Sequence, residues 1–156
     1  MTRQKDARPD YPLGPALDFL QRIWELNHAL ERLSSRMEKR LGVTAQQRLI
    51  IRCIGKFPGM TAGQLATVLH VDPGTVSAAL NRLQGKGLLE RRRDPRDSRR
   101  ASLGLTANGR TLDRPAQGTV EEAVERLLDT ADSKEVSAAV RVVGQLARLL
   151  EDKVQE

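Results

Sequence analysis

The segment DPGTVSAALNRL, residues 72–83, decides the fold, and a strongly basic hairpin sequence follows it. Asp72 is a favourable N-cap, and Pro73 occupies the first helical position, where its missing N–H costs nothing. Apolar residues recur after it at helical spacing, which predicts a helix with one buried face. That face consists of Val76, Ala79, Leu80 and Leu83.

The opposite face of this helix carries small or hydrogen-bonding side chains without negative charge, whereas a merely solvated helix would be rich in Glu and Lys. A helix fits the major groove of DNA, where Ser, Thr, Asn and Arg can reach base edges or phosphates and Ala can touch a thymine methyl group. The alternative is an ordinary amphipathic helix whose outer side is incidentally polar. The residues expected to contact DNA are Thr75, Ser77, Ala78, Asn81 and Arg82.

The neighbouring segments complete a larger motif. Thr61 and Gln64 have the spacing of a capping box and predict a preceding helix that ends near His70. Only two residues then separate it from the cap at Asp72, as in a helix-turn-helix. Downstream, LLERRR (88–93) and RASLGL (100–105) predict two strands around a turn centred on residues 94–98. Helix-turn-helix plus hairpin is a winged helix.

The charge of the chain is concentrated in the same region. Residues 82–110 contain nine basic and three acidic side chains, a net charge of +6, and the whole chain is also +6, so the remainder is neutral. A polyanion is the expected partner, with an affinity that falls steeply with salt. Such a cluster can also be a solvated face or bind anionic lipid, but neither requires a helix-turn-helix beside it.

Residues from about 41 to 109 resemble the winged-helix domain of the MarR (multiple-antibiotic-resistance regulator) family of bacterial transcription factors. The motifs that carry the resemblance are TAGQLA (61–66), VSAALNRL (76–83), KGLL (86–89), DPRDSR (94–99) and LTANG (105–109). The resemblance implies a homodimeric, sequence-specific DNA-binding regulator, more often a repressor.

The wing has its own expected contacts. The resemblance implies that Asp97 braces the wing by pairing with a neighbouring basic group and that Arg99 enters the minor groove, with Arg96 and Arg100 beside it. The alternative is a solvated turn whose surface ion pair contributes little.

Composition limits the remaining possibilities. Aromatic residues make up 3% and apolar residues 39% of the 156 residues, so we expect a modest aliphatic core. A single cysteine excludes an intrachain disulfide and fits a reducing cytoplasm. No apolar run reaches the length of a membrane span, and the first residues lack the apolar segment of a signal peptide. Neither His28 nor His70 has metal-ligand spacing to a partner, so we expect no enzyme, no metal and no cofactor.

The order of segments predicts a mainly α fold with a small β-hairpin wing. We expect a flexible arm (1–11), the first helix of a dimerisation region (12–43), a winged helix-turn-helix domain (44–106) and C-terminal helices of the dimerisation region (107–156). Pro115 is expected to kink a long helix capped by Thr106.

The last helix, from Asp132, repeats apolar residues at three and four, so another helix must cover this seam, within one chain or from a second copy. The resemblance implies a homodimer. Its two-fold symmetry predicts a pseudo-palindromic site with half-sites one helical turn apart.

The resemblance also implies a small aromatic or phenolic effector, for which Trp24 and His28 are candidate pocket residues. The alternative is that Trp24 is only the largest member of an apolar stripe. Cys53 lies on the apolar stripe of the second helix and is expected to pack there rather than sense oxidants. Two rival functions stay open: a nucleoid-associated protein that binds DNA without sequence preference, and a helical adaptor whose basic wing binds an acidic protein.

Overall fold

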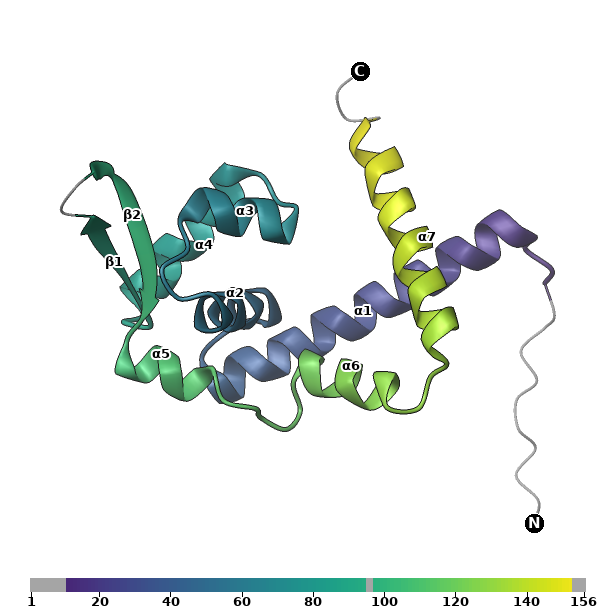
Figure 1. Ribbon diagram of the computed structural model, residues 1–156. Coiled ribbons are helices and arrows are strands. Elements are labelled where there is room, and N and C mark those ends of the chain that lie inside the picture. The colour runs from purple at the N-terminus through teal and green to yellow at the C-terminus, as the bar shows by residue number, and fades with distance from the viewer. Residues whose placement is uncertain (1–10, 95–96, 153–156) are drawn as a thin grey trace, which may run out of the picture.

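The computed structural model describes the backbone of residues 11–94 and 97–152, and the side chains of the same residues except 94 and 97–100. Within these ranges the chain forms seven helices and one two-stranded antiparallel hairpin (Figure 1). The elements are α1 (Pro15–Leu41), α2 (Ala45–Lys56), α3 (Ala62–Leu69), α4 (Pro73–Gly85), β1 (Leu89–Asp94), β2 (Asp97–Leu105), α5 (Ala107–Leu112), α6 (Val120–Leu128) and α7 (Ser133–Asp152).

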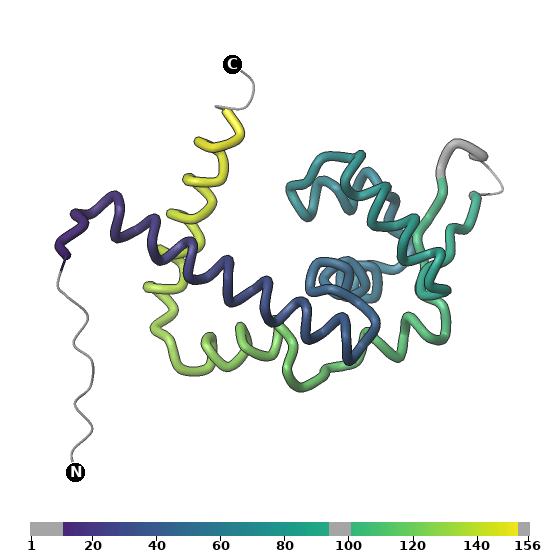
Figure 2. Tube along the Cα trace, turned by 180° about the vertical axis from the view of Figure 1, so that it is seen from behind, coloured from purple at the N-terminus to yellow at the C-terminus, as the bar shows by residue number. Residues whose placement is uncertain are grey.

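The molecule has two parts joined along α1. The helices α2, α3 and α4 and the hairpin gather at the C-terminal end of α1, whereas α7 rises beside its N-terminal half and α6 connects the two parts (Figure 1). The view from behind shows the same arrangement (Figure 2). This is the predicted winged helix-turn-helix with additional helices.

The core lies in the winged-helix part and is aliphatic, as its composition predicts. Buried side chains from α2, α3, α4 and the hairpin form one cluster, to which Ile50, Leu65, Leu80 and Leu103 contribute from the four elements. The face of α4 predicted to be buried is buried in full. A well-packed aliphatic cluster of this kind fixes the orientation of the exposed face of α4.

Side-chain caps set the helix boundaries that the sequence predicts. Thr44 and Thr61 both form complete capping boxes, with Gln47 and Gln64 respectively. His70 ends α3 in the left-handed conformation, at φ 51°, and its backbone N–H bonds back into the helix. The chain therefore turns within two residues and enters α4 directly.

The hairpin is held against the helix-turn-helix by backbone bonds. Leu89 pairs with Leu105 and Arg91 with Leu103 in its antiparallel register. The N–H of Leu103 donates to the carbonyl of Met60 at 2.8 Å, and Thr61 forms an isolated bridge with Ser102. The root of the wing is thus tied to the segment that starts α3.

The segment after α5 differs from the sequence-based expectation of one long, kinked helix. Thr106 caps α5 as expected, but α5 ends at Leu112, and α6 starts only at Val120 with its own cap, Thr119. The carbonyls freed by this break accept hydrogen bonds from arginine side chains. Arg48 donates to the carbonyls of Leu112 and Arg114 and pairs with the Glu121 carboxylate.

Two further arginines hold the same connection. Arg52 donates to the carbonyl of Asp113 and pairs with its carboxylate at 2.9 Å, and Arg40 donates to the carbonyls of Gln117 and Gly118. Pro115 cannot donate a helical hydrogen bond, and bonds from the charged arginine side chains replace those lost at the break.

The C-terminal helices have no buried residue within this chain. Every residue of α6 and α7 is exposed or half-buried, and Val140 is 67% and Leu150 60% exposed. Among the described residues, no helix combines the length and the apolar composition that crossing a membrane requires.

Candidate nucleic-acid interface

The exposed face of α4 is the first part of the candidate site. Asp72 accepts a hydrogen bond from the backbone N–H of Thr75 at 2.9 Å and a second one from its hydroxyl. The bond from the Thr75 hydroxyl, and with it the bond from the backbone N–H, holds the pKa of Asp72 below its ordinary value, so the cap stays charged. Because Thr75 is committed to the cap, its hydroxyl can offer DNA an acceptor but not a donor.

The remaining candidate residues on α4 lie on the same side of the helix. Ser77, Ala78, Asn81 and Arg82 are all exposed, and so is Gly74. Nothing bulky covers this face among the described elements. The predicted inner and outer faces of α4 are both confirmed.

The wing supplies the second part of the site. The side chains of Arg91, Arg92 and Arg93 on β1 are exposed. Arg92 bonds to the Glu90 carboxylate two residues away, which offsets one positive charge locally. The backbone of Asp97, Arg99 and Arg100 lies in β2, whereas their side chains, and all of Arg96, lie outside what the structure describes. The bracing role of Asp97 and the minor-groove role of Arg99 therefore stay predictions.

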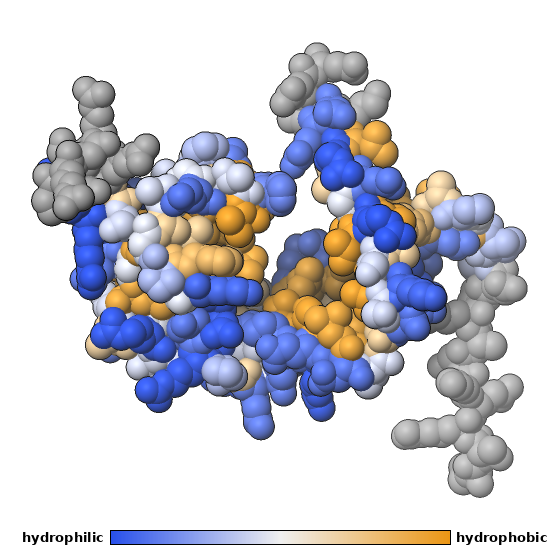
Figure 3. Space-filling view, viewed as in Figure 1, coloured by the Kyte–Doolittle hydropathy of each residue, from blue (hydrophilic) through white to orange (hydrophobic). Residues whose placement is uncertain are grey.

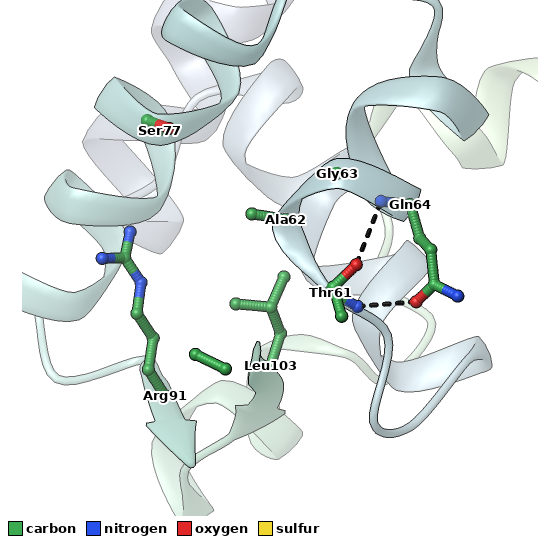
Figure 4. A pocket seen from close by; sticks show the side chains of 8 residues that line it. Thr61, Ala62, Gly63, Gln64, Ser77, Arg91 and Leu103 are labelled. Atoms are coloured by element: carbon green, nitrogen blue, oxygen red, sulfur yellow. Dashed lines mark hydrogen bonds between the residues drawn. The ribbon is translucent and has the colours of Figure 1, made fainter. Parts of the chain in front are cut away.

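A direct contact joins the two parts. The guanidinium of Arg91 donates from Nη2 to Oδ1 of Asn81 at 2.9 Å. Beside this contact lies an open hollow of about 570 Å³. Figure 4 shows Arg91 extending from β1 toward α4, and the first turn of α3 on the other side of the hollow. Its lining residues are Thr61, Ala62, Gly63, Gln64, Ser77, Arg91, Ala101 and Leu103.

The sequence predicts the capping box at the start of α3, but it places neither that turn nor Arg91 among the expected DNA contacts. Arg91 was one of several arginines in a row, and the row alone does not distinguish them. Its position in β1, on the side that faces α4, depends on the register of the hairpin. Neither heptad nor capping patterns in the sequence indicate which arginine faces α4.

The candidate effector residues lie elsewhere, on α1. Trp24 is 62% exposed, and Nδ1 of His28 lies 2.8 Å from the Trp24 carbonyl, an i to i+4 contact on the helix. A groove of about 1000 Å³ begins at Asn27, between α1, α2 and α6. Neither Trp24 nor His28 lines it.

Cys53 packs against the edge of the aliphatic core. Burial raises the pKa of its thiol, and the nearby Lys56 offsets part of that rise. Less thiolate is then available for oxidation, which favours the packing role expected from the sequence. Among the described residues, no group of three or more His, Cys, Asp or Glu side chains is placed to hold a metal ion.

Comparison with known proteins identifies the family of the chain. Residues 41–100 match the sequence profile described as MarR family. The multiple antibiotic resistance protein MarR of Salmonella typhimurium is 34% identical over 118 residues, which cover 70% of this chain and 78% of that protein. An HTH-type transcriptional repressor of Mycobacterium bovis is 30% identical over 88 residues, 56% of this chain and 63% of the repressor, so the match spans less than two thirds of that relative.

A solved structure extends the likeness to most of the chain. FabT of Streptococcus pneumoniae, crystallised in complex with DNA, is 29% identical and superposes with a TM-score of 0.62, covering 88% of this chain and 96% of that one. The chain belongs to the MarR family of winged-helix transcriptional regulators.

Proposed function

We propose that this protein is a homodimeric repressor that binds a pseudo-palindromic DNA site through α4 and the wing. The observation that carries the proposal is the exposed face of α4, with small and polar side chains, beside an exposed arginine strand on one rigid core. Groove-facing residues would read bases, and wing arginines would neutralise phosphates. MarR relatives named as repressors and a DNA complex of FabT support it.

The uncovered helices support the proposed dimer. Burying a large aliphatic side chain contributes about 1.5–3 kcal/mol, and α7 leaves several of them in water. Figure 3 shows apolar surface on the walls of the hollow between α7 and the winged-helix part. A second copy would cover this surface. The exposed residues of α1 and α7 that we assign to the interface are Leu17, Leu20, Trp24, Val140, Val143 and Leu150.

Sedimentation at micromolar concentration tests the dimer. Val140→Glu should produce monomers because the new carboxylate would be buried at the interface. Gln145→Glu places the same charge at an exposed polar position of α7 and serves as the control. A wild-type monomer with an intact α7 by circular dichroism would exclude the proposed dimer.

DNA binding is tested by selecting bound fragments from random duplexes and then competing the selected site against random DNA. A specific regulator should prefer its site by roughly a thousandfold or more. Arg99→Ala should weaken binding to all sequences and lower the log–log salt slope by about one, whereas Asn81→Ala should relax preference at particular bases.

The same competition separates the two rival functions. Equal affinity for selected and random DNA would identify a nucleoid-associated binder. No binding to any duplex at low salt would favour a protein-binding adaptor.

We also propose that an effector acts on the protein. Trp24 and His28 are one candidate place for it. The groove between α1, α2 and α6 is the other, and its charge points to a different ligand. Four carboxylates line the groove, those of Glu31, Glu38, Glu121 and Glu125, together with the guanidinium of Arg52. Glu121 already pairs with Arg48, and Arg52 with Asp113, so the groove keeps a negative charge. Apolar side chains such as Leu30 and Val124 form the rest of its wall.

A groove of this kind favours an apolar cation over a phenolic anion. Thermal shifts with a phenylalkylammonium and with benzoate should therefore differ, with the larger shift for the cation. Glu38→Gln with Glu125→Gln should abolish that shift. If Trp24→Ala abolishes a benzoate shift and the Glu double variant changes nothing, the effector site lies at Trp24.

A further inference from the structure

The contact between the wing and α4 has a consequence for base reading. Arg91 lies on β1 and Asn81 on the exposed face of α4, and the two meet through one hydrogen bond of 2.9 Å. A guanidinium has five N–H donors and no acceptor. The atom of the Asn81 amide that faces Arg91 is therefore the oxygen, because the nitrogen is itself a donor.

This contact orients an amide that would otherwise turn freely. The oxygen and the nitrogen of an asparagine amide point in diverging directions from Cγ, so an oxygen directed at β1 leaves the nitrogen as the atom available to a ligand of α4. Asparagine can read adenine with both atoms, accepting from N6 and donating to N7. Because its oxygen is directed at Arg91, Asn81 presents its N–H groups to the bases.

We propose, on the basis of the proposed DNA-binding function, that Arg91 is a specificity-determining positioning residue that makes Asn81 a hydrogen-bond donor toward the bases. Guanine presents two adjacent acceptors in the major groove, O6 and N7, whereas adenine places the N6 amino donor beside N7. At the base that it reads, Asn81 therefore favours guanine and disfavours adenine.

The surroundings of Arg91 link this reading to the DNA backbone. The same side chain lines the open hollow between the first turn of α3, Ser77 and the hairpin, so a phosphate oxygen can approach its remaining N–H groups. Loss of Arg91 then has two effects, one on all sequences through phosphate and one on a single base through Asn81. A double-mutant cycle separates them.

The test measures the affinity of four proteins for the selected duplex and for its variant with adenine in place of guanine at the position read by Asn81. That position is the one where Asn81→Ala removes the base preference. The proteins are the wild type, Arg91→Met, Asn81→Ala and the double variant. Arg93→Met removes an equal charge from the same face of β1, two residues further on, and is the matched control.

We expect the wild type to prefer guanine by about tenfold. Arg91→Met should lose most of that preference, because the freed amide can turn and bind adenine, while Arg93→Met should keep it. In the Asn81→Ala background, Arg91→Met should weaken both duplexes by the same factor. Because Arg91 is exposed, we expect its replacement to leave the fold intact. Equal urea midpoints will show that each variant folds.

The inference is overturned if Arg91→Met weakens the guanine and adenine duplexes equally in the wild-type background, because Arg91 would then act on phosphate alone. It is also overturned if the wild type prefers adenine at this position. A wild-type protein that binds no duplex refutes the proposed function instead, so the two failures are distinguishable.

Discussion

Replacing Arg48 by methionine should destabilise the protein by about 3 kcal/mol. Arg48 lies on α2, is 1% exposed, and bonds to the Glu121 carboxylate and to the carbonyls of Leu112 and Arg114, the last at 2.7 Å. Methionine keeps the aliphatic volume but leaves all three acceptors without their donor.

The magnitude follows from the surroundings of those acceptors. Removing one partner of a buried ion pair costs about 3–5 kcal/mol, because a buried charge is left uncompensated. The Glu121 side chain is 29% exposed and regains some water, which places the cost at the lower end, about 3 kcal/mol. Changing Glu121 to glutamine in the same protein removes the orphaned charge and should restore about 1 kcal/mol.

Urea unfolding of the wild type, Arg48→Met and Arg48→Met with Glu121→Gln measures these differences. All proteins must be compared at one concentration because dimerisation would couple stability to it. Arg52→Met is the control, since the pair of Arg52 with Asp113 is partly exposed and contributes about 1 kcal/mol or less. A loss below about 1 kcal/mol for Arg48→Met would refute the reasoning, because the buried guanidinium would then not hold the connection.

Three further outcomes are expected. Leu80→Ala should cost about 2–5 kcal/mol in urea unfolding because Leu80 is fully buried in the winged-helix core, whereas Ala78→Gly on the outer face of the same helix should cost about 1 kcal/mol. Gly109→Ala should destabilise the junction of hairpin and α5, since a Cβ there would lie 2.0 Å from the Leu88 carbonyl oxygen; an unchanged melting temperature would contradict this. The depressed pKa of Asp72 means that its cap contributes above its unfolded pKa and is lost as pH falls through the lower folded value, so the thermal stability of the wild type relative to Asp72→Asn should fall on acidification from neutral pH.

The local structure around the site could be predicted from neighbouring residues. Thr61, Asp72 and Thr106 each cap the helix that follows, because a capping hydrogen bond spans only three residues and its pattern is visible in the sequence. The two faces of α4 followed from helical spacing, and the hairpin followed from two short strands around a turn. Three of the four strand ends shifted, by one to three residues, because pairing with the partner strand sets them.

Three features of the protein depended on its tertiary structure. The helix breaks after Leu112 instead of kinking. Arginine side chains more than sixty residues away along the chain donate to the carbonyls that lose their helical hydrogen bonds. Arg48 and Arg91 look like any other arginine in the sequence, yet Arg48 is buried and Arg91 is hydrogen-bonded to Asn81 of α4. The partner of a side chain depends on which remote segments pack together, and short-range sequence patterns do not encode that packing. The local sequence therefore determined the helices and the wing. Packing decided which arginines hold the fold and which one is bonded to the amide of Asn81.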